Sequence, residues 1–169
     1  ASSRYALFFR GRNGTSAAPI VLKAYPGAHP VIAPGAQAPG IDIMQSSYFI
    51  VEGFEVTRAY QRGIAFEEGS NHELRNVWVH DNDGVDDNNM DGVVIHSIEN
   101  FQMHHSLIHD NYDRTCAGTG GYKTTNSRDV GLFRGGNIRL HHNVIFQTPP
   151  ITADKSGGCI LFKHSASLQ

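Results

Sequence analysis

The chain has 169 residues and a formal net charge of −2, from 14 Lys and Arg residues against 16 Asp and Glu residues. This balance argues against a protein that binds nucleic acid through its overall charge, and no apolar run is long enough to span a membrane. Glycine is frequent, at 18 residues, and strong helix formers are sparse, which argues against a helical bundle. The length suits one domain over 1–169 with a buried core.

The first 40 residues differ from the rest of the chain in charge. They hold four basic residues and no acidic residue, so they carry +4 and the remaining residues carry −6. We interpret 1–40 as an N-terminal coil or entry segment and 41–169 as a series of regular coils. This division rests on a repeat that begins near residue 40.

The repeat consists of two series of short predicted strands. The first series alternates apolar and polar residues, as half-buried strands do, and its members begin at Ile50, Leu74, Met103 and Leu140. A glycine introduces each member of the second series, at Gly40, Gly63, Gly92, Gly131 and Gly158. The two series advance in step, so one unit contains two short strands and two turns.

Strands that recur once per unit bury their inward side chains by stacking on the units before and after, which is the solenoid solution. The repeat therefore predicts an all-β solenoid of about 4–5 coils. One internal ladder is expected from Ile50, Leu74, Met103 and Leu140, and a second from Ile41, Ile64 and Val93. A sandwich or an up-and-down barrel also uses many short strands, but the sequence lacks tight two-residue hairpin signals.

Two segments carry a resemblance to a known family. Residues 18–32 read APIVLKAYPGAHPVI, and residues 47–56 read SYFIVEGFEV. Together with the repeat, they resemble right-handed parallel β-helix proteins of the pectate-lyase-like superfamily over nearly the whole chain. The resemblance implies a right-handed parallel β-helix and a secreted, carbohydrate-active protein. It implies the chemistry less sharply, because lyases, hydrolases, epimerases and non-catalytic surface proteins share this fold.

The turns between the first and second strands of successive units differ in length. Long insertions are predicted at 83–91, 112–130 and 149–157. Insertions in a solenoid gather on one face, and that face is often the binding face. We therefore expect these three insertions to build a wall that carries the functional site.

The first insertion is rich in aspartate. Carboxylate, amide and carbonyl oxygens are the ligands of Ca²⁺, and the resemblance implies calcium as well, because pectate-lyase-like enzymes hold it with acidic residues of neighbouring coils. The predicted calcium ligands are Asp83, Asp86, Asp87 and Asp91. The alternative is a solvated loop rich in Asx turns.

The resemblance to lyases also implies β-elimination from a uronate, in which a Lys or Arg base removes a proton while the carboxylate is neutralised. Lys123 in the longest insertion is the first candidate base, and Lys163 at a strand end is the second. Arg134 is counted with these catalytic candidates and could clamp a substrate carboxylate together with Arg128. The alternative for each lysine is an ordinary solvated side chain.

Aromatic and histidine side chains supply further candidates. Tyr112 and Tyr122 could stack on sugar rings, His109 is a third candidate for substrate binding, and Trp78 is expected in the core. Equivalent positions predict that His80 stacks on His109. The same argument stacks His105 on His142, and Asn82 on Asn111. Such stacks are ordinary in solenoids; the alternative for the histidines is a zinc site or a catalytic pair.

Cys116 and Cys159 are the only cysteines of the chain. A disulfide between them would tie down the longest insertion and indicate an oxidising compartment. The alternative is a buried Cys159 and an exposed Cys116, both reduced.

These features favour a secreted polysaccharide lyase that cleaves an acidic glycan. One alternative is a glycoside hydrolase that uses a pair of aspartates, and another is a non-catalytic segment of a surface protein or adhesin. The repeat still runs at Gly158 and no cap is visible beyond it. We therefore expect a fragment of a longer β-helix, with further coils or another chain covering that end.

Overall fold

The computed structural model describes residues 6–35, 38–83, 90–111, 127–148 and 157–163. Strands, bends and turns account for these residues, and none of them is helical. The strands in chain order are β1 (Leu7–Arg10), β2 (Ile20–Lys23), β3 (Val31–Ile32), β4 (Ile41–Met44), β5 (Phe49–Glu52), β6 (Glu55–Thr57), β7 (Arg62–Arg75), β8 (Trp78–His80), β9 (Met90–His104), β10 (Leu107–His109), β11 (Ser127–His141), β12 (Val144–Phe146) and β13 (Gly157–Lys163).

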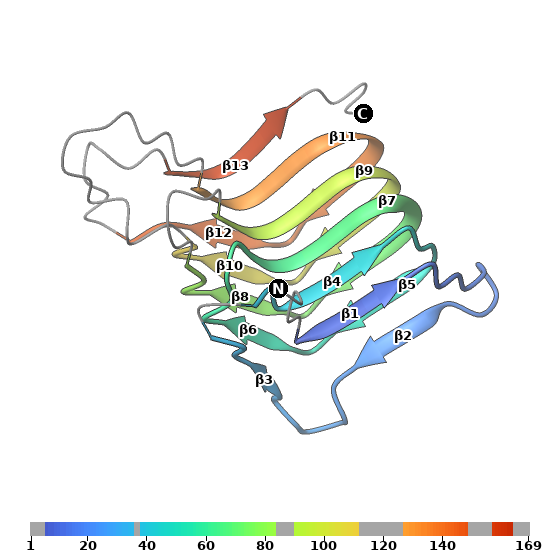
Figure 1. Cartoon of the computed structure of the whole chain (residues 1–169), viewed down its shortest axis with the longest axis horizontal. Coiled ribbons are helices and arrows are strands. Elements are labelled where there is room, and N and C mark those ends of the chain that lie inside the picture. Colours follow the sequence, from blue (N-terminus) through green and yellow to red (C-terminus); the bar gives the residue numbers. More distant parts are fainter. Residues whose placement is uncertain (1–5, 36–37, 84–89, 112–126, 149–156, 164–169) are drawn as a thin grey trace.

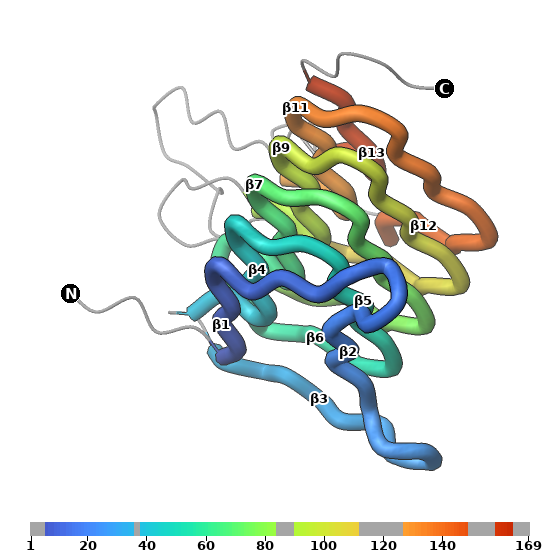
Figure 2. Tube along the Cα trace, turned by 90° about the vertical axis from the view of Figure 1, so that its right-hand side faces the viewer, coloured from blue at the N-terminus to red at the C-terminus, as the bar shows by residue number. Residues whose placement is uncertain are grey.

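A full coil contains one long, bent strand and one short strand, where the sequence predicted two short strands. The long strands β7, β9 and β11 have 14, 15 and 15 residues, and Figure 1 shows each of them curving round the molecule. The short strands β8, β10 and β12 have three residues each. Figure 2 shows the coils stacked on one another along one axis.

Parallel pairing between coils gives two sheets. The larger sheet runs β1-β4-β7-β9-β11-β13, with β2 and β5 beside this path, and the smaller sheet runs β12-β10-β8-β6-β3. The long strand β9 pairs with β7 of the coil before it and with β11 of the coil after it. The predicted all-β parallel β-helix is therefore confirmed.

One of the two predicted ladders is right, and the other is wrong at its first member. Ile41, Ile64 and Val93 are register neighbours, as predicted. In the other ladder Leu74 pairs with Val51, whereas Ile50 lies opposite Glu73. The three residues from Phe49 to Val51 are all apolar, so alternation could not show that Phe49 and Val51 are the buried ones. A slip of one residue turns a side chain to the other face of the sheet.

The glycine series is also wrong at its last two members. Gly131 pairs with Val94 and Gly158 pairs with Arg128, so neither occupies the position of Gly92. The strands begin before these glycines, at Met90, Ser127 and Gly157. The C-terminal ends of the three predicted insertions 83–91, 112–130 and 149–157 therefore belong to strands. These ends are residues 90–91, 127–130 and 157.

Single residues with positive φ form the corners of the coils. One corner position is held by Glu68, Ser97 and Arg134, and another by Asn71, Asn100 and Asn137, all with φ between 52° and 59°. Asparagine tolerates this left-handed conformation better than most residues. The asparagine side chains also bond along the axis, with Nδ2 to Oδ1 distances of 3.2 and 2.6 Å.

The core lies between the two sheets and consists of inward side chains stacked coil upon coil. Phe66 and Phe101 are fully buried, with ring centroids 5.1 Å apart. Trp78 is not in this core, because Val77 and Val79 take the buried positions and Trp78 is 41% exposed. The predicted histidine stacks are confirmed. The ring centroids lie 5.2 Å apart for His80 and His109, and 5.1 Å apart for His105 and His142.

A buried amide ladder ends on a carboxyl group. Asn82 donates from Nδ2 to Oδ1 of Asn111 at 2.7 Å, and Asn111 donates from Nδ2 to Oδ1 of Asp129 at 2.9 Å. The predicted asparagine stack is therefore confirmed, with Asp129 as its last member. The other oxygen of Asp129 has no hydrogen-bond partner in the described residues. Burial raises the pKa of Asp129 from 3.8 to about 7, against the lowering effect of the bonds from Asn111.

We expect Asp129→Asn to stabilise the protein by about 2–4 kcal/mol at pH 8. A raised carboxyl pKa means that the folded state binds the proton more tightly than the unfolded state. Asp129 therefore lowers the free energy of unfolding hardly at all near pH 4. The loss of stability grows between about pH 4 and pH 7, as the aspartate of the unfolded chain releases its proton. Urea unfolding at pH 4.5 and pH 8 measures the difference, with Glu99→Gln as an exposed control. Equal effects of Asp129→Asn at both pH values would contradict this account.

The far end of the larger sheet exposes apolar side chains. Ile160 and Phe162 of β13 continue the buried positions of Val130 and Leu132 and are 40% and 45% exposed. The further coils or second chain predicted for this end stay a prediction.

Candidate functional site

The larger sheet carries a cluster of charged side chains on the outer surface of its strands. We call this cluster the charged face and define it by Asp42, Arg62, Glu67, Asp91, His96 and Arg128. Its first row is set by register, because Arg62 pairs with Asp91 and Asp91 pairs with Arg128 across three coils. The glycines that follow, Gly63 and Gly92, point inward, where a Cβ atom would lie 2.7 Å from Val79 or 2.5 Å from Asn111. The residue before each glycine is therefore turned outward.

A buried ion pair forms the centre of the charged face. The Arg128 guanidinium lies 3.1 Å from Oδ1 of Asp91, and the two side chains are only 7% and 8% exposed. Arg128 also lies over the ring of Phe133, 5.3 Å from its centroid. Burial raises the pKa of Asp91 from 3.8 to about 6, although the positive charges of Arg128 and Arg62 act in the opposite direction.

A second buried carboxyl group, that of Asp42, lies at the other end of the charged face. The Asp42 side chain is fully buried, and neither of its oxygens has a hydrogen-bond partner in the described residues. Burial raises its pKa from 3.8 to about 6, Arg62 lowers it, and Glu67 raises it further. Arg62 therefore influences the protonation of both Asp42 and Asp91.

The accessible part of the charged face consists of Arg62, Glu67 and His96. Nη1 of Arg62 is paired with Oε1 of Glu67, and the two side chains are 26% and 17% exposed. Glu67 and His96 are register neighbours on β7 and β9. The His96 ring meets Phe133 edge-on, with the centroids 6.2 Å apart. A ligand at this surface would meet the guanidinium of Arg62 and the imidazole of His96 on either side of Glu67.

This arrangement has the attributes of a reactive site. Carboxyl groups with raised pKa values beside a specific cation are more frequent at functional sites than elsewhere. A guanidinium binds carboxylates well, and imidazole is the usual side chain for proton transfer near neutral pH. The charged face can therefore bind an anionic ligand and exchange protons with it.

The structure brings together some of the predicted site residues. Asp91 and Arg128 meet in the buried ion pair, so the Arg128 guanidinium already has a carboxylate partner. Lys163 is exposed on β13 and continues the outer row of His96 and Phe133. Arg134 follows Phe133 as an exposed corner residue with φ of 52°.

Other predicted residues lie elsewhere. His109 is on the smaller sheet, stacked between His80 and Phe146 and accepting a hydrogen bond from Trp78. Asp83 forms an isolated bridge with Tyr60. Outside the described residues lie Asp86, Asp87, Tyr112, Cys116, Tyr122 and Lys123. Cys159 is exposed on β13, and its disulfide with Cys116 stays a prediction.

The predicted calcium site stays a prediction, because Asp86 and Asp87, two of its four predicted ligands, lie outside the described residues. In the described ranges no group of three His, Cys, Asp or Glu side chains is placed to hold a metal ion. Asp91 fits the ligand role poorly, because Arg128 is bonded to the Oδ1 atom that a cation would use.

Four members of the charged face were not predicted: Asp42, Arg62, Glu67 and His96. One signal in the sequence could have found Arg62. It stands directly before Gly63, as Asp91 stands directly before Gly92, and both glycines were recognised as strand starts. Asp42 shows a weaker signal, because it interrupts an apolar strand between Ile41 and Ile43.

The comparison with protein families agrees with the fold. In the part of the chain that is described, no helix could cross a membrane. No curated protein matches the chain in sequence. Among solved structures, an alginate lyase from Paenibacillus sp. str. FPU-7 is similar, with a TM-score of 0.46 and 16% identity over 78% of this chain and 51% of that chain. The present chain thus spans about half the length of that enzyme. The family model described as a right handed beta helix region matches residues 32–168, so this chain belongs to the right-handed β-helix family.

Proposed function

We propose that the chain is part of a secreted protein that binds an acidic glycan at the charged face and cleaves it by β-elimination. One observation carries the proposal. The accessible guanidinium of Arg62 acts on two buried carboxyl groups, those of Asp42 and Asp91, and is paired with Glu67, the register neighbour of His96. The strands that follow the three predicted insertions, β9, β11 and β13, begin beside the first row of this face.

The proposed reaction needs a cation and a base. Arg62 binds the uronate carboxylate, and its charge makes the neighbouring C–H bond more acidic. A base then removes that proton, its electron pair forms a carbon–carbon double bond, and the adjacent carbon–oxygen bond to the leaving sugar breaks. The leaving oxygen takes up a proton from the protonated base or from water, so the products are an unsaturated uronate and a new chain end.

His96 is the base that we propose, because it is the register neighbour of Glu67, the ion-pair partner of Arg62. Lys163, a base predicted from the sequence, lies on the same outer row but two strands further along. Asp42, Asp91 and Arg128 are buried and serve as positioning residues that set the charge around Arg62.

A glycoside hydrolase is the second candidate, and the raised pKa values of Asp42 and Asp91 favour it. Both are raised to about 6. A hydrolase needs one carboxyl group that is protonated and one that is ionised at the working pH. Two buried acids with pKa values close to neutrality could divide these roles.

Incubation with uronate polymers tests the proposal. We expect the near-ultraviolet absorbance of unsaturated uronate to rise with at least one polymer among alginate, polygalacturonate and glucuronate-containing glycans. Arg62→Gln should lower the rate about 100-fold, because the developing charge loses its cation. Arg12→Gln, an exposed arginine in the turn after β1, should leave the rate unchanged. Release of reducing ends without absorbance would support the hydrolase, and no cleavage of any polymer would contradict both proposals.

A further inference from the structure

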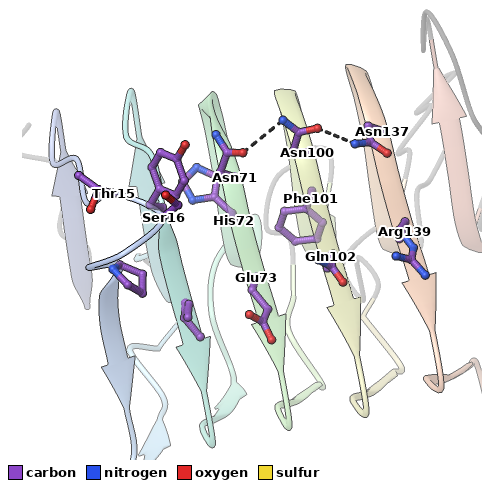
Figure 3. A pocket seen from close by; sticks show the side chains of 13 residues that line it. Thr15, Ser16, Asn71, His72, Glu73, Asn100, Phe101, Gln102, Asn137 and Arg139 are labelled. Carbon is purple, nitrogen blue, oxygen red and sulfur yellow. Dashed lines mark hydrogen bonds between the residues drawn. The ribbon is translucent and has the colours of Figure 1, made fainter.

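A groove crosses the outer surface of the larger sheet beyond the bend from the charged face. We call it the amide groove; its volume is about 380 Å³ and it runs across β5, β7, β9 and β11. Figure 3 shows two rows of side chains there, one formed by Asn71, Asn100 and Asn137, and the other by Glu73, Gln102 and Arg139. Thr15, Ser16 and Tyr48 line its other end. The proposed reaction uses none of these residues.

Several polar groups in the groove have unused hydrogen-bonding capacity. Arg139 and Gln102 are exposed, and neither has a side-chain partner within bonding distance in the described part of the chain. The asparagine row ends at Asn137, which donates to Asn100 but receives no bond in return within the same part. Arg75 and His104 both bond to Oε1 of Glu73, which offsets the negative charge of that carboxylate.

The order of these groups favours an extended ligand over a compact one. Adjacent coils lie about 4.8 Å apart, so the coil of Tyr48 and the coil of Arg139 are separated by three coil spacings, or roughly 14 Å. One position per coil offers an amide, a carboxylate or a guanidinium. Amides and carboxylates bond to pairs of hydroxyl groups, and a guanidinium bonds to a carboxylate in two places. An extended chain with hydroxyl groups on every unit and carboxylates on some matches this spacing.

We propose that the amide groove is a second, non-catalytic binding site for an acidic oligosaccharide that lies parallel to the helix axis. Arg139 binds a uronate carboxylate, Gln102 and Asn137 bind hydroxyl groups, and Tyr48 packs against a sugar ring at the other end. The proposal rests on the proposed function for its substrate class. The sheet bends between the charged face and the groove (Figure 2), so one straight oligosaccharide cannot occupy both.

A second site on the same molecule changes how a polymer is held. Binding of one stretch of the polymer raises the local concentration of the next stretch at the other site. The amide groove should therefore lower KM for long polymers and have little effect on kcat. Short oligosaccharides that fill only one site should show no such gain.

Direct binding tests the groove separately from catalysis. Uronate hexasaccharides of alginate and of polygalacturonate are titrated into the His96→Gln protein, and the side-chain amide signals of Gln102, Asn100 and Asn137 are followed by NMR. We expect saturable shifts of these signals with at least one hexasaccharide. Arg139→Gln should weaken this binding about 10-fold, as expected for the loss of a charge-assisted hydrogen bond. Arg12→Gln is the matched control and should bind as the parent does.

The outcomes separate this proposal from the proposed function. Groove shifts in a protein that cleaves no polymer would overturn the proposed function and support the groove. Cleavage together with shifts confined to the charged face would overturn the groove and support the proposed function. In a cleaving protein, Arg139→Gln should raise KM for the polymer about 10-fold with kcat unchanged; a fall in kcat with KM unchanged would also overturn the groove.

Discussion

Replacing Arg128 with methionine should lower the free energy of unfolding by about 3–5 kcal/mol at pH 8. The reason is that Asp91 stays buried while its charge loses the partner that lies 3.1 Å away. Methionine keeps most of the volume and the contact with Phe133, so the change removes charge more than packing. Urea unfolding of the parent and the variant measures the difference.

The pH dependence separates charge from packing. The pKa of Asp91 is already raised to about 6, and loss of Arg128 raises it further. The folded variant therefore prefers the protonated acid. The destabilisation should be small at pH 4, where Asp91 is largely protonated in the folded parent and in the folded variant, and it should grow as pH rises. Asp91→Asn combined with Arg128→Met should restore most of the loss at pH 8. A loss that is equal at pH 4 and pH 8, or that the double variant retains, would show that packing is responsible.

Replacing His96 with glutamine should reduce kcat on a uronate polymer by about 100- to 10,000-fold. Glutamine keeps hydrogen-bonding ability near Glu67 but cannot accept a proton in the working pH range. His105→Gln, a corner position outside the charged face, is the matched control and should change kcat by less than about twofold.

Lys163→Gln provides the competing test. Lys163 and His96 lie on the same outer row of the sheet, separated by Phe133. If Lys163→Gln abolishes activity and His96→Gln does not, the base predicted from the sequence is correct and the assignment to His96 is wrong. Thermal unfolding of both variants should match the parent, because both residues are on the outer surface.

The fold could be predicted from the sequence because each coil of a β-helix repeats the same pattern of inward and outward residues. Leu74, Met103 and Leu140 repeat one inward position, and the structure places them in register. The errors occurred where a local pattern was ambiguous. Phe49, Ile50 and Val51 are all apolar, so alternation did not define the inward face. Trp78 was assigned to the core from its register with Leu107 and Val144, although the alternation of Val77 and Val79 turns it outward.

The candidate site was less predictable because it is made by register between distant segments. The strands that carry Arg62, Asp91 and Arg128 pair in register although long segments separate them in the sequence. The sequence shows no direct sign of that pairing. Asp91, for example, pairs with an arginine 37 residues away. The raised pKa values of Asp42 and Asp91 depend on burial, which composition does not reveal.

Product analysis in water enriched in heavy oxygen tests the central claim most directly. A uronate oligosaccharide is incubated with the protein, and the products are examined by mass spectrometry. β-Elimination breaks the carbon–oxygen bond without adding water, so the account predicts an unsaturated product that is one water lighter than the hydrolysis product and contains no heavy oxygen. Saturated products with one heavy oxygen at the new chain end would contradict the account and establish hydrolysis at this face.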